Sequence, residues 1–169
     1  MKIQVQNSQI SDIDTIFQFY DMAIAHQKKV FNKHWQVFDR ALIETEIADN
    51  RQYKILVEGV VACVFAVTFE DKLIWGDKDA DSIYIHRIVT NPEFRGYSFV
   101  KEIIKWAKAF APSKGIKYIR MDTWADNEKL LEYYTSCGFE YVGVIKMEET
   151  EGLPKHYEGI SLSLFEIKL

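Results

Sequence analysis

The chain has little cysteine and no cysteine motif. Its 169 residues include two cysteines, Cys63 and Cys137, and neither stands at the spacing of a metal site or a redox motif. Both lie in apolar segments, so we expect buried free thiols in a reducing compartment. No cluster of histidine and cysteine has the spacing of metal ligands, and the sequence therefore predicts no bound metal.

Long hydrophobic runs and an excess of positive charge are also missing. The longest apolar run, Val60 to Val67, is far too short to span a bilayer, and the residues after Met1 alternate instead of forming the apolar core of a signal peptide. The formal net charge is -4 at pH 7, and no concentrated basic stretch indicates nucleic-acid binding. We therefore expect a cytoplasmic protein that binds neither a membrane nor a nucleic acid.

Apolar and aromatic residues, by contrast, are abundant. Hydrophobic residues make up 48% of the chain and aromatic residues 14%, which is typical of globular proteins and not of disordered ones. A chain of 169 residues suits one domain, and no internal repeat, low-complexity tract or linker divides it. The sequence predicts a single domain over residues 1–169.

Strand and helix patterns alternate along this domain. The expected strands cover about residues 3–6, 53–57, 60–69, 83–89, 117–122, 139–147 and 159–168. The first expected helix has its N-cap at Ser11 and carries Ile13, Ile16, Phe17, Tyr20 and Ile24 on one side. Three further helices are expected over about residues 40–49, 98–110 and 127–137. The acidic segment 70–82 is expected to be a long loop or flap. This order predicts an α/β protein with one mixed sheet and helices on both faces.

The loop between the strand 83–89 and the helix that begins near Ser98 is the most informative segment. Pro92 ends the strand because it has no N–H to donate, and the loop continues as Arg95-Gly96-Tyr97-Ser98. The first N–H groups of a helix have no partner within it, and the helix dipole favours negative charge there. Taken alone, the loop is either a plain turn or an anion site, for which a phosphate-bearing cofactor is the obvious ligand.

A second informative segment follows the next strand. Asn127 or Asp126 is placed to cap a helix, and Tyr134 lies in that helix, which ends at Gly138. Tyr133 is rotated by about 100° from Tyr134, so the two side chains cannot serve the same site. Taken alone, Asn127 is equally a plain capping residue, and a tyrosine such as Tyr134 is more often part of a core.

Together the two segments resemble the Gcn5-related N-acetyltransferase (GNAT) family. Its members carry Arg/Gln-x-x-Gly-x-Gly/Ala in the loop after the fourth strand, and further along an Asn, a Tyr and a Gly-Phe pair. This chain has Arg95 to Val100 at the first place, and Asn127, Tyr134 and Gly138-Phe139 at the second. It departs from the family at Ser98 and Val100, where the family usually has Gly and then Gly or Ala.

The resemblance implies the acyl-CoA N-acyltransferase fold, with a central mixed six- to seven-stranded sheet flanked by helices on both faces, and acetyl-CoA as co-substrate. It implies that the pantetheine arm lies along the backbone of Ile88 and Val89 and contacts Asn127. It places the pyrophosphate on the loop, whose residues are Arg95, Gly96, Tyr97, Ser98, Phe99 and Val100. It implies that Tyr134 protonates the departing thiolate.

The acceptor amine needs a proton acceptor, because an alkyl amine is mostly protonated at pH 7. His86 is the first candidate, since it interrupts an apolar strand and histidine titrates near neutral pH; a structural histidine is an equally open interpretation. Asp122, at the end of the next strand, is the second candidate. The family's acceptor pocket maps by position onto residues that include Phe31, Trp35 and His156.

These expectations define a function and two alternatives. We predict an N-acetyltransferase that moves an acetyl group from acetyl-CoA to a primary amine of a small molecule or peptide by direct attack. A sensor or regulatory module that binds acyl-CoA without turnover stays open because of Ser98 and Val100, and so does an α/β interaction domain without a cofactor. The sequence leaves open the acceptor and the oligomeric state, including a homodimer that pairs the final strand.

Overall fold

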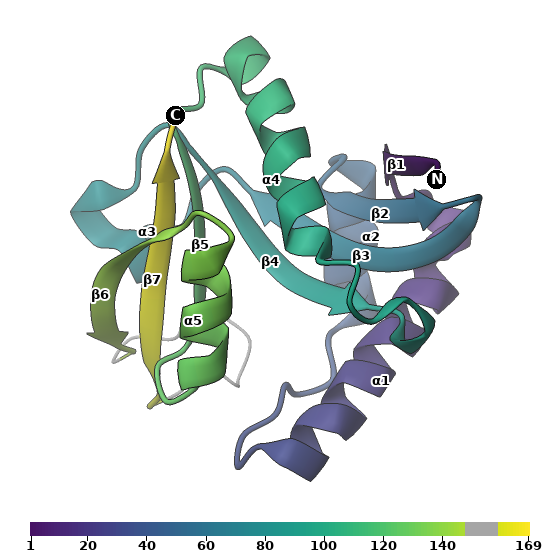
Figure 1. Ribbon diagram of the computed structural model, residues 1–169, viewed down its shortest axis with the longest axis horizontal. Helices are drawn as coiled ribbons and strands as arrows, with labels where there is room; N and C mark the ends of the chain where they lie inside the picture. Colours follow the sequence, from purple (N-terminus) through teal and green to yellow (C-terminus); the bar gives the residue numbers. More distant parts are fainter. Residues whose placement is uncertain (148–158) are drawn as a thin grey trace. The chain divides into compact units, whose positions relative to one another are not determined.

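The computed structural model describes residues 1–147 and 159–169. Seven strands form one sheet in the order β1-β2-β3-β4-β5-β7-β6, with flanking helices (Figure 1). The pairing of β4 with β5 is parallel, whereas β1 with β2, β2 with β3, β5 with β7 and β6 with β7 are antiparallel pairs. The predicted α/β fold with a mixed sheet is therefore confirmed.

Most element positions agree with those expected from the sequence. The strands are β1 (Ile3–Asn7), β2 (Gln52–Val57), β3 (Val60–Thr68), β4 (Ser82–Thr90), β5 (Tyr118–Trp124), β6 (Glu140–Lys146) and β7 (Ser161–Lys168). The α-helices are α1 (Ile13–Val30), α2 (Arg40–Ala48), α3 (Lys72–Trp75), α4 (Phe99–Phe110) and α5 (Glu128–Ser136). Short 3-10 helices are η1 (Ile10–Asp12), η2 (Gly76–Lys78), η3 (Pro92–Phe94) and η4 (Ala111–Lys114).

Two local predictions are wrong. Ser11 does not cap α1 but lies inside η1, where the Gln9 N–H donates to the Asp12 carboxylate at 2.7 Å. The acidic segment 70–82 is not a plain loop, because it contains α3 and η2. Ile74 and Trp75 are buried in α3, and this burial orders a segment whose many acidic residues suggested a solvated loop.

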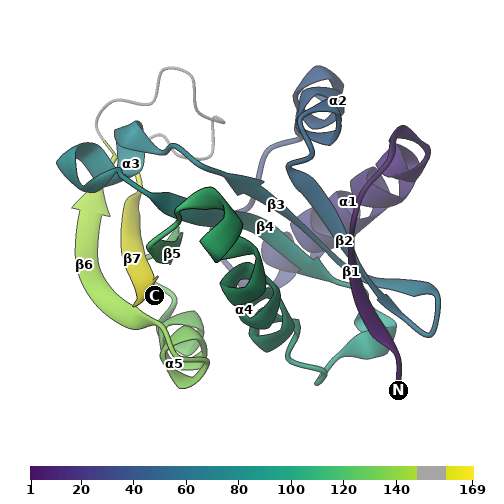
Figure 2. The ribbon, with the colours of Figure 1, turned by 90° about the horizontal axis from the view of Figure 1, so that it is seen from above.

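The chain divides into two compact units, and the first comprises Met1–Ala66 and Arg87–Phe99. In Figure 2, α1 and α2 lie next to β1 and β2. The core of this unit joins apolar side chains of both helices to Val64 of β3 and Val89 of β4. From the helices and their connection it takes Ile13, Ile16, Phe19, Tyr20, Phe38, Ile43 and Ile47. Each such side chain stabilises the fold by about 1.5–3 kcal/mol when fully buried, and the core holds Val89 in place.

The second unit comprises Val67–His86 and Val100–Leu169. Its strands β5, β7 and β6 lie side by side, with α5 drawn in front of them (Figure 1). Leu162 and Leu164 of β7 share a core with Trp75 of α3. Phe165 points to the opposite face, where its ring centroid lies 5.5 Å from that of Tyr134 in α5. Helices therefore cover both faces of the sheet in this unit, as the sequence predicted. One domain over residues 1–169 stays a prediction.

The two cysteines are free. Cys63 is fully buried, and burial raises the pKa of its thiol to about 12, which makes it an unreactive thiol. Cys137 is only partly buried, so the expectation of buried thiols is confirmed for Cys63 alone.

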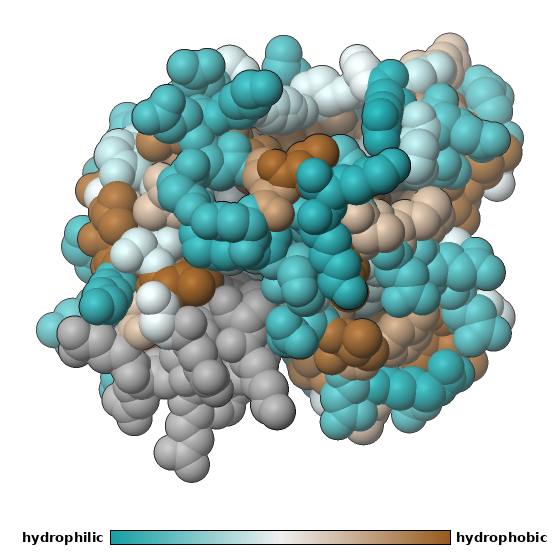
Figure 3. Space-filling model, turned by 90° about the horizontal axis from the view of Figure 1, so that it is seen from below, coloured by the Kyte–Doolittle hydropathy of each residue, from teal (hydrophilic) through white to brown (hydrophobic). Residues whose placement is uncertain are grey.

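Two features describe the surface. On the face drawn in Figure 3, hydrophobic residues form small groups separated by hydrophilic ones. Over residues 1–147 and 159–169, none of the helices combines the length and the apolar character that crossing a membrane requires.

Candidate active site

The loop after β4 is fastened to β3 before it reaches Arg95. The Asn91 backbone N–H donates to the Ala62 carbonyl at 2.8 Å, and the Asn91 side-chain amide donates to the Val61 carbonyl at 3.2 Å. The Asn91 Oδ1 also accepts a hydrogen bond from the Glu93 N–H at 3.1 Å and so caps η3. One asparagine therefore ends the strand, anchors the loop and starts the next turn.

Aromatic packing shapes the rest of this loop. The ring of Tyr97 stacks on that of Phe99 with 5.7 Å between centroids, and Phe94 meets Tyr97 edge-on at 5.5 Å. The Arg95 side chain is exposed, and the N–H groups in the first turn of α4 have no partner within the helix. The loop thus has the exposed cation and the helix start that the predicted anion site requires. Phosphate binding there stays a prediction.

The two departures from the family motif have different structural consequences. Ser98 has a φ of +52°, a left-handed conformation that glycine adopts without steric cost and other residues adopt at some cost. The backbone at Ser98 therefore has the conformation for which glycine is suited. Val100 is buried, with 7% of its surface exposed, so its side chain packs inside the protein.

The strand β4 loses its regular pairing and backbone conformation before and at Arg87. Its parallel pairing with β5 runs from Ser82 to Tyr84 and ends there. Arg87 has a φ of +51°, which is rare for a residue with a long side chain inside a strand. This irregularity immediately precedes Ile88 and Val89, the two residues that the resemblance assigns to the pantetheine arm.

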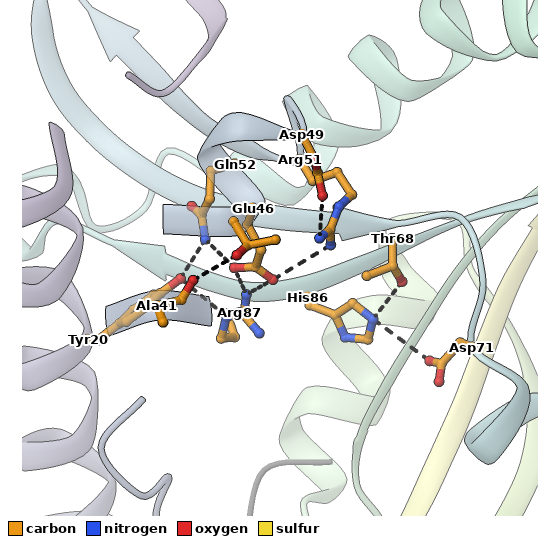
Figure 4. A network of polar contacts seen from close by, with 11 residues as sticks. Tyr20, Ala41, Glu46, Asp49, Arg51, Gln52, Thr68, Asp71, His86 and Arg87 are labelled. Carbon is orange, nitrogen blue, oxygen red and sulfur yellow. Dashed lines mark hydrogen bonds and ion pairs between the residues drawn. The ribbon is translucent and has the colours of Figure 1, made fainter. Parts of the chain in front are cut away.

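A buried ionic network in the first unit holds Arg87 in this conformation (Figure 4). Its Nη2 contacts both carboxylate oxygens of Glu46 in α2, and its Nε donates to the Tyr20 hydroxyl at 3.2 Å. The Gln52 side-chain amide donates to Glu46 and to Tyr20, each at 3.0 Å. The exposed fractions are 13% for the Arg87 side chain and 3% for that of Glu46.

The network also fixes the charge of Arg87. Burial alone would lower the pKa of Arg87, but Tyr20 and Glu46 oppose this effect and raise the pKa above its usual value. The guanidinium therefore stays protonated. The Gln52 Oε1 is buried and has no hydrogen-bond partner within the part of the chain that the structure describes.

In the second unit, Asn127 combines a capping role with an unused donor. Its Oδ1 accepts a hydrogen bond from the Leu130 N–H at 3.1 Å and so caps α5. Its Nδ2 is buried, and no hydrogen-bond acceptor among the described residues contacts it. A buried donor without a partner costs about 1–3 kcal/mol, so this atom is suited to a ligand that brings an acceptor.

Tyr134 lies in α5 and is partly buried. Its ring packs edge-on against Phe165 and Phe139, with centroids 5.5 and 6.2 Å away. Burial, followed by the proximity of Tyr133, Asp122 and Cys137, raises the pKa of Tyr134 above its usual value. The hydroxyl therefore keeps its proton at neutral pH, as a proton donor must.

His86 of β4 faces a carboxylate that sequence reasoning missed. Its Nε2 lies 3.7 Å from the Oδ2 of Asp71 and 3.3 Å from the Oγ1 of Thr68 (Figure 4). The exposed fraction of the Asp71 side chain is 8%, and that of the His86 side chain is 16%. The histidine therefore lies in a partly buried polar environment that contains an acid.

Asp71 and Asp122 form an electrostatically coupled pair of acids. Burial, with a contribution from Asp79, raises the pKa of Asp71 to about 7. Burial, with a contribution from Asp71, raises the pKa of Asp122 to about 8. Like charges in a poorly solvated place disfavour joint ionisation, so the pair retains a proton near neutral pH.

The second unit therefore gathers three predicted catalytic residues. Asp122 influences Tyr134, and Asp71 influences Asp122 and faces His86. The predicted cofactor residues Ile88, Val89 and Arg95 to Phe99 belong to the first unit, and Val100 and Asn127 to the second. The assigned roles of these residues stay predictions.

The predicted acceptor residues Phe31 and Trp35 have separate surroundings in the first unit. The Trp35 ring packs edge-on against Tyr20 and Phe38, and its backbone N–H donates to the Gln27 side chain at 2.8 Å. Trp35 therefore borders the core of the first unit. Phe31 is 40% exposed and meets the ring of His26 with 6.4 Å between centroids.

The remaining acceptor residue, His156, lies outside the described residues. Among the residues that the structure does describe, no group of three or more histidine, cysteine, aspartate or glutamate side chains is placed to hold a metal ion.

Sequence signals for the missed residues differ. Glu46 lies three residues after Ile43 and directly before Ile47, both buried in α2, so its place on the apolar face of a helix is visible in the sequence. Asp71 gives no such signal, because it stands among the many acids of the segment 70–82.

The strand order and the flanking helices define the acyl-CoA N-acyltransferase fold. The model of the acetyltransferase (GNAT) family matches residues 16–139, which is most of the chain. The chain therefore belongs to the GNAT family, and the resemblance noted in the sequence is confirmed.

Similar proteins extend this comparison. An uncharacterized N-acetyltransferase of Bacillus subtilis (strain 168), YesJ, is 31% identical over 74 residues, which are 43% of this chain and 41% of that protein. The chain thus matches about two-fifths of the length of this curated relative.

Solved structures show the same fold. A GNAT-family acetyltransferase from Listeria monocytogenes 4b F2365 superposes with a TM-score of 0.78 at 22% identity, covering 99% of this chain and 95% of that one. A putative acetyltransferase from Salmonella typhimurium, yncA, solved with its cofactor acetyl-CoA, gives a TM-score of 0.70 at 12% identity, covering 100% of this chain and 95% of that one.

The backbone conformation at Ser98 predicts an inverted preference between glycine and alanine. Both Ser98→Gly and Ser98→Ala remove the hydroxyl, but only glycine adopts a φ of +52° without strain. We expect Ser98→Gly to be more stable than Ser98→Ala by about 1 kcal/mol in urea unfolding. The matched pair Lys105→Gly and Lys105→Ala, at an exposed position inside α4, should show the opposite order, because alanine favours a helix over glycine by about 1 kcal/mol. Equal orders at the two positions would contradict the conformation at Ser98.

The buried network predicts that Glu46 and Arg87 depend on each other. Glu46→Ala leaves a buried guanidinium without its partner, and the free energy of unfolding should fall by about 3–5 kcal/mol. Glu44→Ala, on the exposed side of α2, should cost about 0.5 kcal/mol or less. The double variant Glu46→Ala/Arg87→Ala should lose less stability than the sum of its two single variants. Strict additivity in chemical denaturation would disprove the coupling.

Proposed function

We propose that the protein is an acetyl-CoA-dependent N-acetyltransferase that acetylates a primary amine of a small molecule or peptide. The observation that carries the proposal is the group of side chains at the end of β5 and in α5. There, a tyrosine that keeps its proton lies near an acid that is protonated close to neutral pH, and Asn127 has a buried donor without a partner. Membership of the acetyltransferase (GNAT) family supports the same proposal.

The family motif assigns the parts of acetyl-CoA to residues whose chemistry suits them. Acetyl-CoA, when bound, would supply an acetyl group activated as a thioester. Arg95 and the N–H groups of Gly96, Phe99 and Val100 would hold the pyrophosphate, since a helix start with an exposed arginine favours an anion. The backbone of Ile88 and Val89 would hold the pantetheine arm, and the unused Nδ2 of Asn127 would donate a hydrogen bond to it.

Proton transfer falls to side chains of the second unit. Tyr134 holds a proton at its hydroxyl that it gives to the leaving thiolate. The burial that raises the pKa of Tyr134 would raise the pKa of a thiol beside it as well, which keeps the transfer close to balanced. His86 and Asp122 are the candidates that take the proton from the amine, and a partner such as Asp71 favours His86.

A binding module without turnover is the alternative that Ser98 and Val100 suggested. Ser98 already has a backbone conformation suited to glycine, and the Val100 side chain is buried. Neither residue therefore gives a steric reason against cofactor binding, and we favour the enzyme.

The test is the release of free thiol from acetyl-CoA in the presence of an amine panel. The panel contains a polyamine, an amino sugar, an amino acid and a peptide with a free N-terminus. We expect thiol release that depends on one class of amine. Protection from thermal unfolding by acetyl-CoA without thiol release would support the binding module. The absence of both effects would support an interaction domain without a cofactor.

The most direct test of the proton-donor role is a substitution of Tyr134. Tyr134→Phe removes the proton donor and keeps the ring packing, so kcat should fall by about a hundredfold or more while the KM for acetyl-CoA stays the same. Tyr141→Phe is the matched control, because Tyr141 is an exposed tyrosine of β6, and it should keep the wild-type kcat. Unchanged turnover in Tyr134→Phe would remove Tyr134 from the mechanism.

A further inference from the structure

We propose that Asp71 is a positioning residue that orients His86 and stabilises its protonated form, so that His86 takes the proton of the acceptor amine. The inference rests on the proposed function and adds to it a residue that the family motifs do not contain. It favours His86 over Asp122 as the base, because an adjacent carboxylate stabilises a protonated histidine, whereas it makes a second acid harder to ionise.

Asp71 is fixed by its own backbone contacts. The Asp71 N–H donates to the Oδ1 of Asp79 at 3.1 Å, and the Asp71 carbonyl accepts a hydrogen bond from the Trp75 N–H at 2.9 Å. These contacts fix the backbone of Asp71 at the start of α3, and none of them involves His86.

The carboxylate oxygen that pairs with the histidine is the Asp71 Oδ2. The Asp71 Oδ2 is buried and accepts no hydrogen bond from any residue that the structure describes. The His86 Nε2 lies 3.7 Å from this oxygen and 3.3 Å from the Thr68 Oγ1 (Figure 4). Because a carboxylate accepts hydrogen bonds and does not donate them, Asp71 favours the tautomer with the hydrogen on Nε2. The lone pair is then on the other ring nitrogen.

The surrounding charges set the pH range in which the pair acts. Asp79 raises the pKa of Asp71, Asp71 raises the pKa of Asp122, and Asp122 raises the pKa of Tyr134.

Asp79 has polar partners of its own: the Tyr84 hydroxyl donates to Asp79 at 2.5 Å, and Arg120 donates to Tyr84 at 3.3 Å. Burial first and Asp79 second raise the pKa of Asp71 to about 7. Asp71 therefore ionises as the pH rises through neutrality, and only then does it offer His86 a negative charge.

The proton balance of the step is simple. The ammonium form of the acceptor first releases one proton to solvent. The neutral amine nitrogen then loses one proton as it becomes an amide nitrogen, and the lone pair of the His86 imidazole takes that proton. The imidazolium carries a positive charge, which the adjacent Asp71 carboxylate stabilises. Tyr134 gives its proton to the thiolate, and solvent later moves the proton of His86 back to Tyr134. Asp71 forms and breaks no covalent bond.

Kinetics as a function of pH separate this role from a purely structural one. In Asp71→Asn, kcat with both substrates saturating should fall by about tenfold to a hundredfold, since the positioning of a general base is lost. The remaining activity should extend to lower pH than in the wild type. His86 loses its anionic partner and Asp122 loses a like-charged neighbour, and both losses make these groups easier to deprotonate.

Two further variants serve as controls. Asp71→Glu keeps a carboxylate and should recover part of kcat, whereas a purely structural requirement would favour the isosteric asparagine. Asp77→Asn alters an exposed acid of the same segment and should leave the pH profile of kcat unchanged. An Asp71→Asn profile that is lower but not shifted would overturn the proposal.

A titration of the histidine decides the inference without any turnover. The imidazole signals of His86 are followed by NMR in the wild type and in Asp71→Asn, with His86→Gln to assign them. We expect the titration midpoint of His86 to move to lower pH in Asp71→Asn and to stay in place in Asp77→Asn. An unchanged midpoint in Asp71→Asn would refute the pairing. If no amine on the panel is acetylated, the proposed function fails, and the titration still shows whether Asp71 acts on His86.

Discussion

The ion pair between Arg87 and Glu46 is the interaction on which the middle of β4 depends. A strand residue with a positive φ and a long side chain is unfavourable by itself, and burying a guanidinium is more unfavourable still. Glu46, Tyr20 and Gln52 provide the hydrogen bonds that make both tolerable. The next residues along the strand, Ile88 and Val89, are therefore presented on a fixed backbone.

His86, the residue of β4 before Arg87, also pairs with an acid, Asp71, but a histidine loses its proton at a much lower pH than an arginine does. The difference is chemical: Arg87 stays charged because its partners raise its pKa, whereas histidine and an acid with a pKa of about 7 both change charge near neutral pH. One strand thus carries a permanent ion pair for structure and a titratable pair that suits proton transfer.

Much of the fold and part of the site could be predicted from the sequence. Alternating strands and periodic helices are local patterns, and their order restricted the fold to a mixed sheet with flanking helices. Arg95, Asn127 and Tyr134 stand at motif spacings within short segments, so the family was recognisable.

Asp71 could not be found in this way, because its importance depends on the burial of Ile74 and Trp75 in α3 and on a contact with a distant strand. The predicted N-cap at Ser11 was wrong for a local reason, because a capping box between Gln9 and Asp12 begins the helical segment earlier. Ser98 shows the opposite case: the sequence marks it as an exception to the motif, and its backbone keeps the conformation that glycine would have.

The central claim is that this chain binds acetyl-CoA through the loop at Arg95 and through Asn127, and the most direct measurement is an NMR titration of the labelled protein with acetyl-CoA. We expect saturable shifts of the backbone amides of Gly96, Phe99 and Val100 and of the Asn127 side-chain amide, because these groups would gain hydrogen-bond acceptors. No shifts at millimolar acetyl-CoA, or saturable shifts confined to other residues, would contradict it.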